Sequence, residues 1–148
     1  MASIDAVGQN TQDSFGNFRL ANVTVPVSLT ATGNAVVALP ILKGGTGGTT
    51  QYILRRITVA NLTNTAGGTA PNAATANISI GQTSDGANLV ANAQVLTALT
   101  GALTFNDVTL NATSNATAFT ANALFVNVNT SVANAQVFIS VYGDIVTF

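Results

Sequence analysis

Apolar and polar residues alternate along most of the chain after residue 22, and this alternation predicts β-strands. In residues 22–30, Val23, Val25, Val27 and Leu29 occupy every second position. A period of two indicates a half-buried strand, because successive strand side chains point to opposite faces. Pro26 cannot donate a backbone hydrogen bond, so this strand is expected at a sheet edge. Similar patterns predict strands within residues 34–39, 52–63, 75–81, 103–110, 122–130 and 135–148.

The same alternation predicts which side chains of the later strands share a face. The expected apolar faces consist of Ala76, Ile78 and Ile80, of Leu124, Val126 and Val128, and of Val137, Ile139 and Val141. Phe138 and Tyr142 are expected on the opposite face of the last strand. These assignments predict a core between sheets, with one face of each strand turned inward.

Residues 87–101 are the one ambiguous segment, since their apolar residues fit a short helix about as well as a strand. Elsewhere, clusters of Gly, Pro and Asn such as 43–50 and 64–75 separate the strands and are typical of exposed loops. The glycines of 43–50 lack the terminal Gly-Lys-Ser/Thr of a phosphate-binding loop, because Lys43 precedes them. About eight short strands without βαβ alternation predict an all-β fold, an antiparallel β-sandwich or jelly roll.

The first 21 residues are polar and show neither strand nor helix periodicity. We therefore expect an N-terminal arm at 1–21 and a single β-sandwich domain at 22–148. Phe15, Phe18 and Leu20 are larger apolar residues of this arm, and they are candidate anchors on a neighbouring subunit. The alternative is a terminus that lies on its own domain.

Composition points to assembly rather than to a free monomer. The chain has 148 residues, of which 47% are hydrophobic and only 6% charged, with a net charge of −1. Its 17 Asn and 22 Thr make neutral polar groups the main solubilising surface. Low net charge gives little electrostatic protection against self-association, so we expect an oligomer. The longest apolar run, 35–42, is too short for a membrane helix, and we expect neither a membrane partner nor a secretory signal.

The side chains that usually carry catalysis are scarce. The sequence contains no His, Cys or Glu, and its carboxylates are five aspartates. A Ser-His-Asp relay is therefore impossible. The aspartates do not cluster as they do in a calcium-binding loop. Four cations spread along the chain provide little affinity for nucleic acid. We expect a protein that is not an enzyme, with no cofactor, no metal and no nucleic-acid partner.

Two adjacent arginines, Arg55 and Arg56, lie inside a predicted strand. Because neighbouring strand side chains point to opposite faces, the two arginines cannot both face water if one face is core, and one of them has to be covered. Arg55 is expected to be the covered one, because its face is the more apolar. It then needs a carboxylate partner such as Asp107 or Asp144, with Arg56 on the other face at a subunit contact. The alternative is a solvated Arg55 at the end of a strand.

Three segments, YILRRITVANLT (52–63), TANISIGQTSDGANLVANAQVLTALT (75–100) and VFISVYGDIVTF (137–148), resemble tailed-bacteriophage capsid decoration, or cement, proteins of the jelly-roll type. The resemblance covers roughly residues 50–148 and includes paired arginines and a closing strand of the form V-Y-G-D. It implies a jelly-roll domain that forms homotrimers on the outside of a capsid and bridges adjacent capsomers. It supplies no catalytic residues.

The resemblance and the composition together lead to one functional expectation. The chain is expected to be a structural virion protein on the capsid exterior, assembled in the host cytoplasm, with itself and the major capsid protein as partners. A trimeric tail-fibre or receptor-binding module is the alternative. Such a module is expected to present aromatic residues for sugar stacking, and the chain has no Trp and two Tyr.

Overall fold

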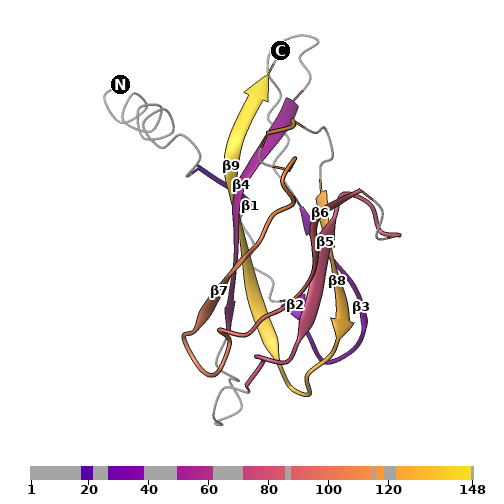
Figure 1. The fold of residues 1–148 in the computed structure, drawn as a ribbon, viewed down its shortest axis with the longest axis vertical. Helices are drawn as coiled ribbons and strands as arrows, with labels where there is room; N and C mark the ends of the chain where they lie inside the picture. Colours follow the sequence, from indigo (N-terminus) through magenta and orange to yellow (C-terminus); the bar gives the residue numbers. More distant parts are fainter. Residues whose placement is uncertain are drawn as a thin grey trace.

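The computed structural model describes residues 18–21, 27–38, 50–61, 72–85, 88–114, 116–118 and 123–147. Within these ranges the chain forms nine strands and no helix (Figure 1). The strands are β1 Phe18–Ala21, β2 Val27–Ser28, β3 Gly33–Ala38, β4 Thr50–Asn61, β5 Asn77–Gly81, β6 Leu89–Val95, β7 Phe105–Val108, β8 Ala123–Thr130 and β9 Gln136–Thr147. The predicted all-β fold is confirmed.

The strands form two antiparallel sheets that face each other (Figure 1). One sheet has the order β1-β9-β4-β7, with β2 also paired to β9, and the other has the order β3-β8-β5-β6. We call them the β4–β9 sheet and the β5–β8 sheet. Four of the strand pairs are nested in sequence, like the two arms of one long hairpin. They are β2·β9, β3·β8, β4·β7 and β5·β6. The pairs β4·β9 and β5·β8 close this hairpin into the two layers of a jelly roll.

The core lies between the sheets and is made of the strand faces that alternation predicted. Leu124, Val126 and Val128 of β8 are buried, as are Val137, Ile139 and Val141 of β9. Ala76, Ile78 and Ile80 are also buried. The outward positions are thus free to carry polar groups.

Of the segment 87–101, the described residues 88–101 are not helical, since β6 occupies Leu89–Val95 and turns follow it. The β5·β6 register shifts between Ile78 and Ile80 and again between Ile80 and Gly81. These shifts bury both Val90 and Ala91, two neighbours that would otherwise point to opposite faces. Because such bulges break strict alternation, the segment resembles a helix in its sequence.

The N-terminal boundary differs from the expected one. Residues 18–21, assigned to the arm from the sequence, form β1, in which Phe18 is in register with Gly143 and Arg19 with Tyr142. The backbone of Leu20 therefore also belongs to the sheet, whereas Phe15 lies outside the described residues. Of the strand expected at 22–30, the structure describes β2 and the residues after it, and Pro26 lies outside. No described helix is long and apolar enough to cross a membrane.

Candidate functional site

A β-bulge places both arginines on the outer face of the β4–β9 sheet. The β4·β9 register shifts between Leu54 and Arg56, so Arg55 is the extra residue of a bulge in β4. Leu54 is buried before the bulge and Ile57 after it. Two consecutive residues, Arg55 and Arg56, therefore point away from the core. The expectation that one arginine faces the apolar side was wrong, because it assumed unbroken alternation.

Arg55 forms an ion pair with Asp144 on β9. Arg55 Nε lies 2.8 Å from Asp144 Oδ2, within hydrogen-bond distance. The Asp144 side chain is only 10% exposed and that of Arg55 is 33% exposed. A carboxylate covered to this extent needs hydrogen-bond donors to compensate for lost hydration, and the guanidinium supplies one. Of the two aspartates expected near Arg55, the structure thus places Asp144 beside it.

Arg56 stacks on an aromatic ring of the next strand. Its guanidinium carbon lies 4.5 Å from the centroid of the Tyr142 ring, which is in register with it on β9. A cation over a ring at an exposed site contributes about 0.5–1 kcal/mol and also fixes the direction of a long side chain. Arg56 itself is exposed. The stack holds the positive charge at the surface in a defined position.

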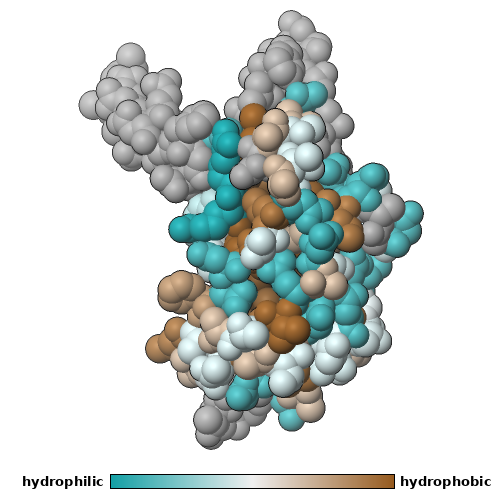
Figure 2. All heavy atoms as spheres, in the orientation of Figure 1, coloured by the Kyte–Doolittle hydropathy of each residue, from teal (hydrophilic) through white to brown (hydrophobic). Residues whose placement is uncertain are grey.

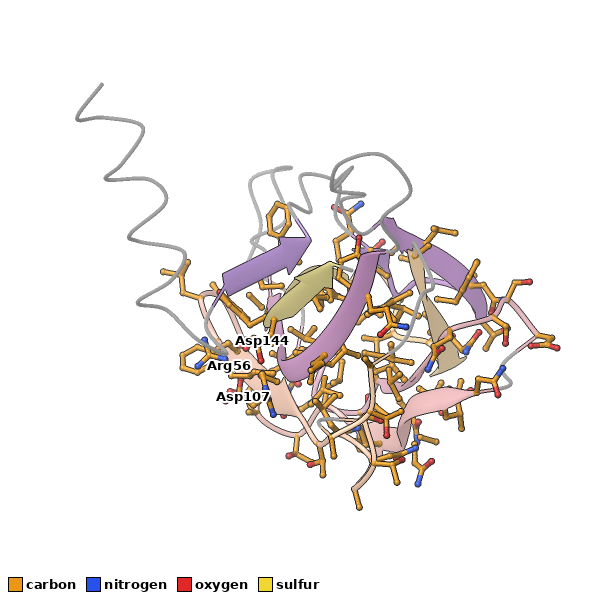
Figure 3. All side chains as sticks on the ribbon, turned by 90° about the horizontal axis from the view of Figure 1, so that it is seen from above. Arg56, Asp107 and Asp144 are labelled. Carbon is orange, nitrogen blue, oxygen red and sulfur yellow. The ribbon has the colours of Figure 1, made fainter. Side chains whose placement is uncertain are left out.

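Asp107 lies on β7, separate from Arg55. Its Oδ1 accepts a hydrogen bond of 2.6 Å from Thr58 Oγ1, and the two residues are cross-strand partners. Asp107 is exposed. Arg56, Asp107 and Asp144 all lie on the same side of the molecule (Figure 3). The ion pair of Arg55 and Asp144 includes neither Arg56 nor Asp107.

An apolar row crosses the same outer face beside the charges. Ala60 of β4 is in register with Phe105 of β7 and with Phe138 of β9. Phe105 is 65% exposed, and Phe138 is half-buried. Sequence reasoning placed Phe138 on an outward face but did not single out Phe105. Its outward position could have been inferred from Val108, which lies three residues later with the opposite orientation.

A tight turn before β7 presents a second exposed apolar residue, Leu103. Leu103 is 87% exposed and has a φ of 59°. This value lies in the left-handed region, which is energetically unfavourable for leucine. Buried Asn61 supports the turn, because its Nδ2 donates to Gly101 O (2.9 Å) and its backbone N–H donates to Thr104 O (2.8 Å). Thr104 Oγ1 also donates to Gly101 O at 2.6 Å. Hydrophobic side chains project at this end of β7 in Figure 2. The turn was not predicted from the sequence.

Charge is strongly divided between the two sheets. The chain has four Lys or Arg and five Asp, and five of these nine lie in strands of the β4–β9 sheet: Arg19, Arg55, Arg56, Asp107 and Asp144. The strands of the β5–β8 sheet contain none. Figure 2 shows strongly hydrophilic side chains along the margin beside β4 and β9. The outer face of the β4–β9 sheet is therefore the candidate site, with ion-pairing, ring-stacking and apolar groups on one surface.

A second concave region lies over β6 and the segment after β7. It has a volume of about 530 Å³ and is lined by Asn92, Ala93, Gln94, Thr109, Leu110, Asn111 and Ala112. Its amides are largely engaged within the fold. Gln94 Nε2 donates to Thr109 O, and Gln94 Oε1 accepts from Thr109 N–H. The segment after β7 therefore covers the exposed edge of β6, and this cover prevents the edge strand from pairing with other chains.

The described residues include no group of three or more His, Cys, Asp or Glu that could hold a metal. Comparison of the chain with family models, with curated proteins and with solved structures found no match.

Proposed function

We propose that this chain is a structural protein of a phage virion that binds the outer surface of the capsid as a homotrimer and stabilises the shell by bridging capsomers. The observation that carries the proposal is the meeting of its most distinctive motifs at one site. The paired arginines and the V-Y-G-D strand, Val141–Asp144, are almost 90 residues apart. They contact each other through the Arg55 ion pair and the Arg56 stack. These are the motifs that carry the resemblance to capsid decoration proteins.

The chemistry of the face supports adhesion. It offers one compensated ion pair, two exposed charges of opposite sign and an apolar row, which are the components of a protein–protein contact. The chain contains no His, Cys or Glu to exchange protons near neutral pH or to act as an activated nucleophile. A surface of this kind binds partners and leaves them chemically unchanged.

Bridging then stabilises the shell through linkage. A trimer bound across several capsomers must detach before they separate, so its binding free energy adds to the free energy that holds the particle together. Threefold symmetry multiplies the effect, because three linked contacts share a high effective concentration. Individually weak contacts are thus sufficient for a stable clamp.

Electron microscopy and heat stability of the virion test this proposal. We expect density for the chain in groups of three on the outside of the shell. Particles assembled without the chain are expected to release their genome at a lower temperature, and adding back purified protein is expected to restore the original temperature. Density on the tail instead of the shell, or equal heat stability with and without the chain, would contradict the capsid role.

A further inference from the structure

We propose that Arg56 of one copy of this chain binds Asp107 of the next copy, forming the salt bridge that sets the register of the homotrimer. The inference rests on the homotrimer of the proposed function and names its contact. Both residues are exposed on the same outer face and carry opposite charges. In the described part of the chain neither takes part in an ion pair, whereas Arg55 and Asp144 neutralise each other.

The two free charges lie on opposite flanks of β4. Arg56 stacks on Tyr142, so its guanidinium leans from β4 toward β9. Asp107 lies on β7, which pairs with β4 on the other side. The face therefore has a positive flank at β9 and a negative flank at β7. When the positive flank of one copy meets the negative flank of the next, the contact is head-to-tail, and contacts of this type close into a ring of three when each copy is rotated by a third of a turn from the last.

Both charges are held in place before any partner arrives. The Tyr142 ring fixes the direction of Arg56, and the Thr58 hydroxyl fixes one oxygen of Asp107. A side chain that is already ordered loses less conformational entropy when it binds, so preorganised charges favour association. Phe105, two residues from Asp107 and 65% exposed, supplies apolar surface that excludes water next to the pair.

The face is large enough to take part in both contacts that one copy makes in a ring. Strands β4 and β9 have 12 residues each. At about 3.3 Å per residue and 4.8 Å between strands, these two strands with the shorter β1 and β7 cover on the order of 500 Å² per copy. In a ring of three, each copy divides this face between two neighbours, so the whole trimer buries on the order of 1,500 Å² of these surfaces. A second copy, which carries both charges in the same spacing, is thus a complementary occupant.

Charge reversal of the purified full chain tests the pair. The wild type is expected to sediment as three copies of the 14.9 kDa chain. Arg56→Asp and Asp107→Arg are each expected to weaken the association about tenfold or more, because like charges then face each other. The double variant Arg56→Asp/Asp107→Arg is expected to recover the trimer. Asn92→Asp and Asn92→Arg, which add charge at an exposed position of β6, are expected to leave the mass unchanged. Thermal unfolding of each variant shows that it is folded.

Three results would overturn the pairing: trimers that persist in both single variants, a double variant that fails to recover, or a wild type that is monomeric. Binding to isolated shells separates this failure from that of the proposed function. A monomer that binds shells and loses binding in Arg56→Asp assigns Arg56 to the shell protein and leaves the capsid role standing. A dimer rescued by the double variant supports the pairing and contradicts the homotrimer.

Discussion

The outer faces of the two sheets are built on the same strand geometry but carry opposite chemistry. The β4–β9 sheet carries charges, stacked rings and an exposed Phe105. The β5–β8 sheet carries uncharged groups, among them Asn77 and Asn129, which bond to each other at 3.3 Å. Neutral amides bind water well but provide little long-range attraction or repulsion. Within its strands, the chain thus concentrates its charges on one sheet and leaves the other sheet neutral.

The largest expected effect on stability comes from deleting one residue of β4. A deletion inside the bulge and a deletion in the regular part of the strand should have different outcomes. Removing one arginine leaves Leu54 and the remaining arginine opposite Gly143 and Tyr142, which are consecutive on β9. That variant is expected to fold, with a loss of about 2 kcal/mol from the missing ion pair. Removing Thr58 instead shifts Val59 from the core to the outer face, and we expect a loss of about 5 kcal/mol or more.

Circular dichroism and urea unfolding of the two deletion variants provide the measurement. If the single-arginine deletion unfolds as completely as the Thr58 deletion, Arg55 is not an extra residue in the ladder. The wild-type register with both arginines outward would then have to be abandoned.

Substitution of each arginine by methionine separates a covered charge from an exposed one. Arg55→Met removes the guanidinium from Asp144, whose side chain is 10% exposed, and we expect a loss of about 2 kcal/mol in the free energy of unfolding. Arg56→Met removes only the stack on Tyr142, and a loss of about 0.5–1 kcal/mol is expected. Urea unfolding of both variants, at a concentration where each is monomeric, gives the comparison. Equal losses would contradict the assigned roles.

Substitution by alanine is expected to cost more stability at a buried asparagine than at an exposed one. Asn61→Ala removes the side chain that supports the turn before β7, and we expect a loss of about 1–2 kcal/mol because Asn61 is 2% exposed. Asn129→Ala, on the exposed face of β8, removes two hydrogen bonds of 3.3 Å and is expected to cost about 0.5 kcal/mol or less. Thermal unfolding midpoints rank the two. An Asn129 effect as large as that of Asn61 would show that the amide face also holds the fold together.

The smallest expected effect is a gain in stability from a substitution in the turn before β7. Leu103→Gly relieves the left-handed backbone at φ 59° and removes a side chain that is 87% exposed. Since glycine also makes the unfolded chain more flexible, the net gain is expected to be about 0.5 kcal/mol. Ala102→Gly, one residue earlier and without a positive φ, is the matched control and is expected to lose stability. Calorimetry of the two variants should give opposite signs, and a loss at both positions would contradict strain at Leu103.

The fold was largely predictable from period-two alternation, and its bulges were not. Leu124, Val126 and Val128 alternate without interruption, so their burial follows from spacing alone. At Arg55 the bulge inserts one extra residue, which reverses the face on which each later residue of β4 lies. Nothing in the local sequence distinguishes such a bulge from an unbroken strand. The same reason left residues 87–101 undecided between helix and strand.

The site was predictable in its residue types but not in its contacts. A covered arginine requires a carboxylate, which narrowed the choice to Asp107 and Asp144. The choice between them depends on the β4·β9 and β4·β7 pairings, which join residues far apart in the chain. The ring under Arg56 and the turn at Leu103 likewise depend on register and on a buried asparagine from another strand.

Cysteine labelling tests most directly whether assembly occurs through the β4–β9 sheet. The chain has no cysteine, so single variants report one position each. Phe105→Cys and Val36→Cys make a matched pair, because these side chains are 65% and 62% exposed on different sheets. We expect maleimide to react with both at similar rates in dilute monomer, and the Phe105→Cys variant to become protected in the trimer while Val36→Cys stays reactive. Protection of Val36→Cys with continued reactivity at Phe105→Cys would contradict the assignment of the contact face.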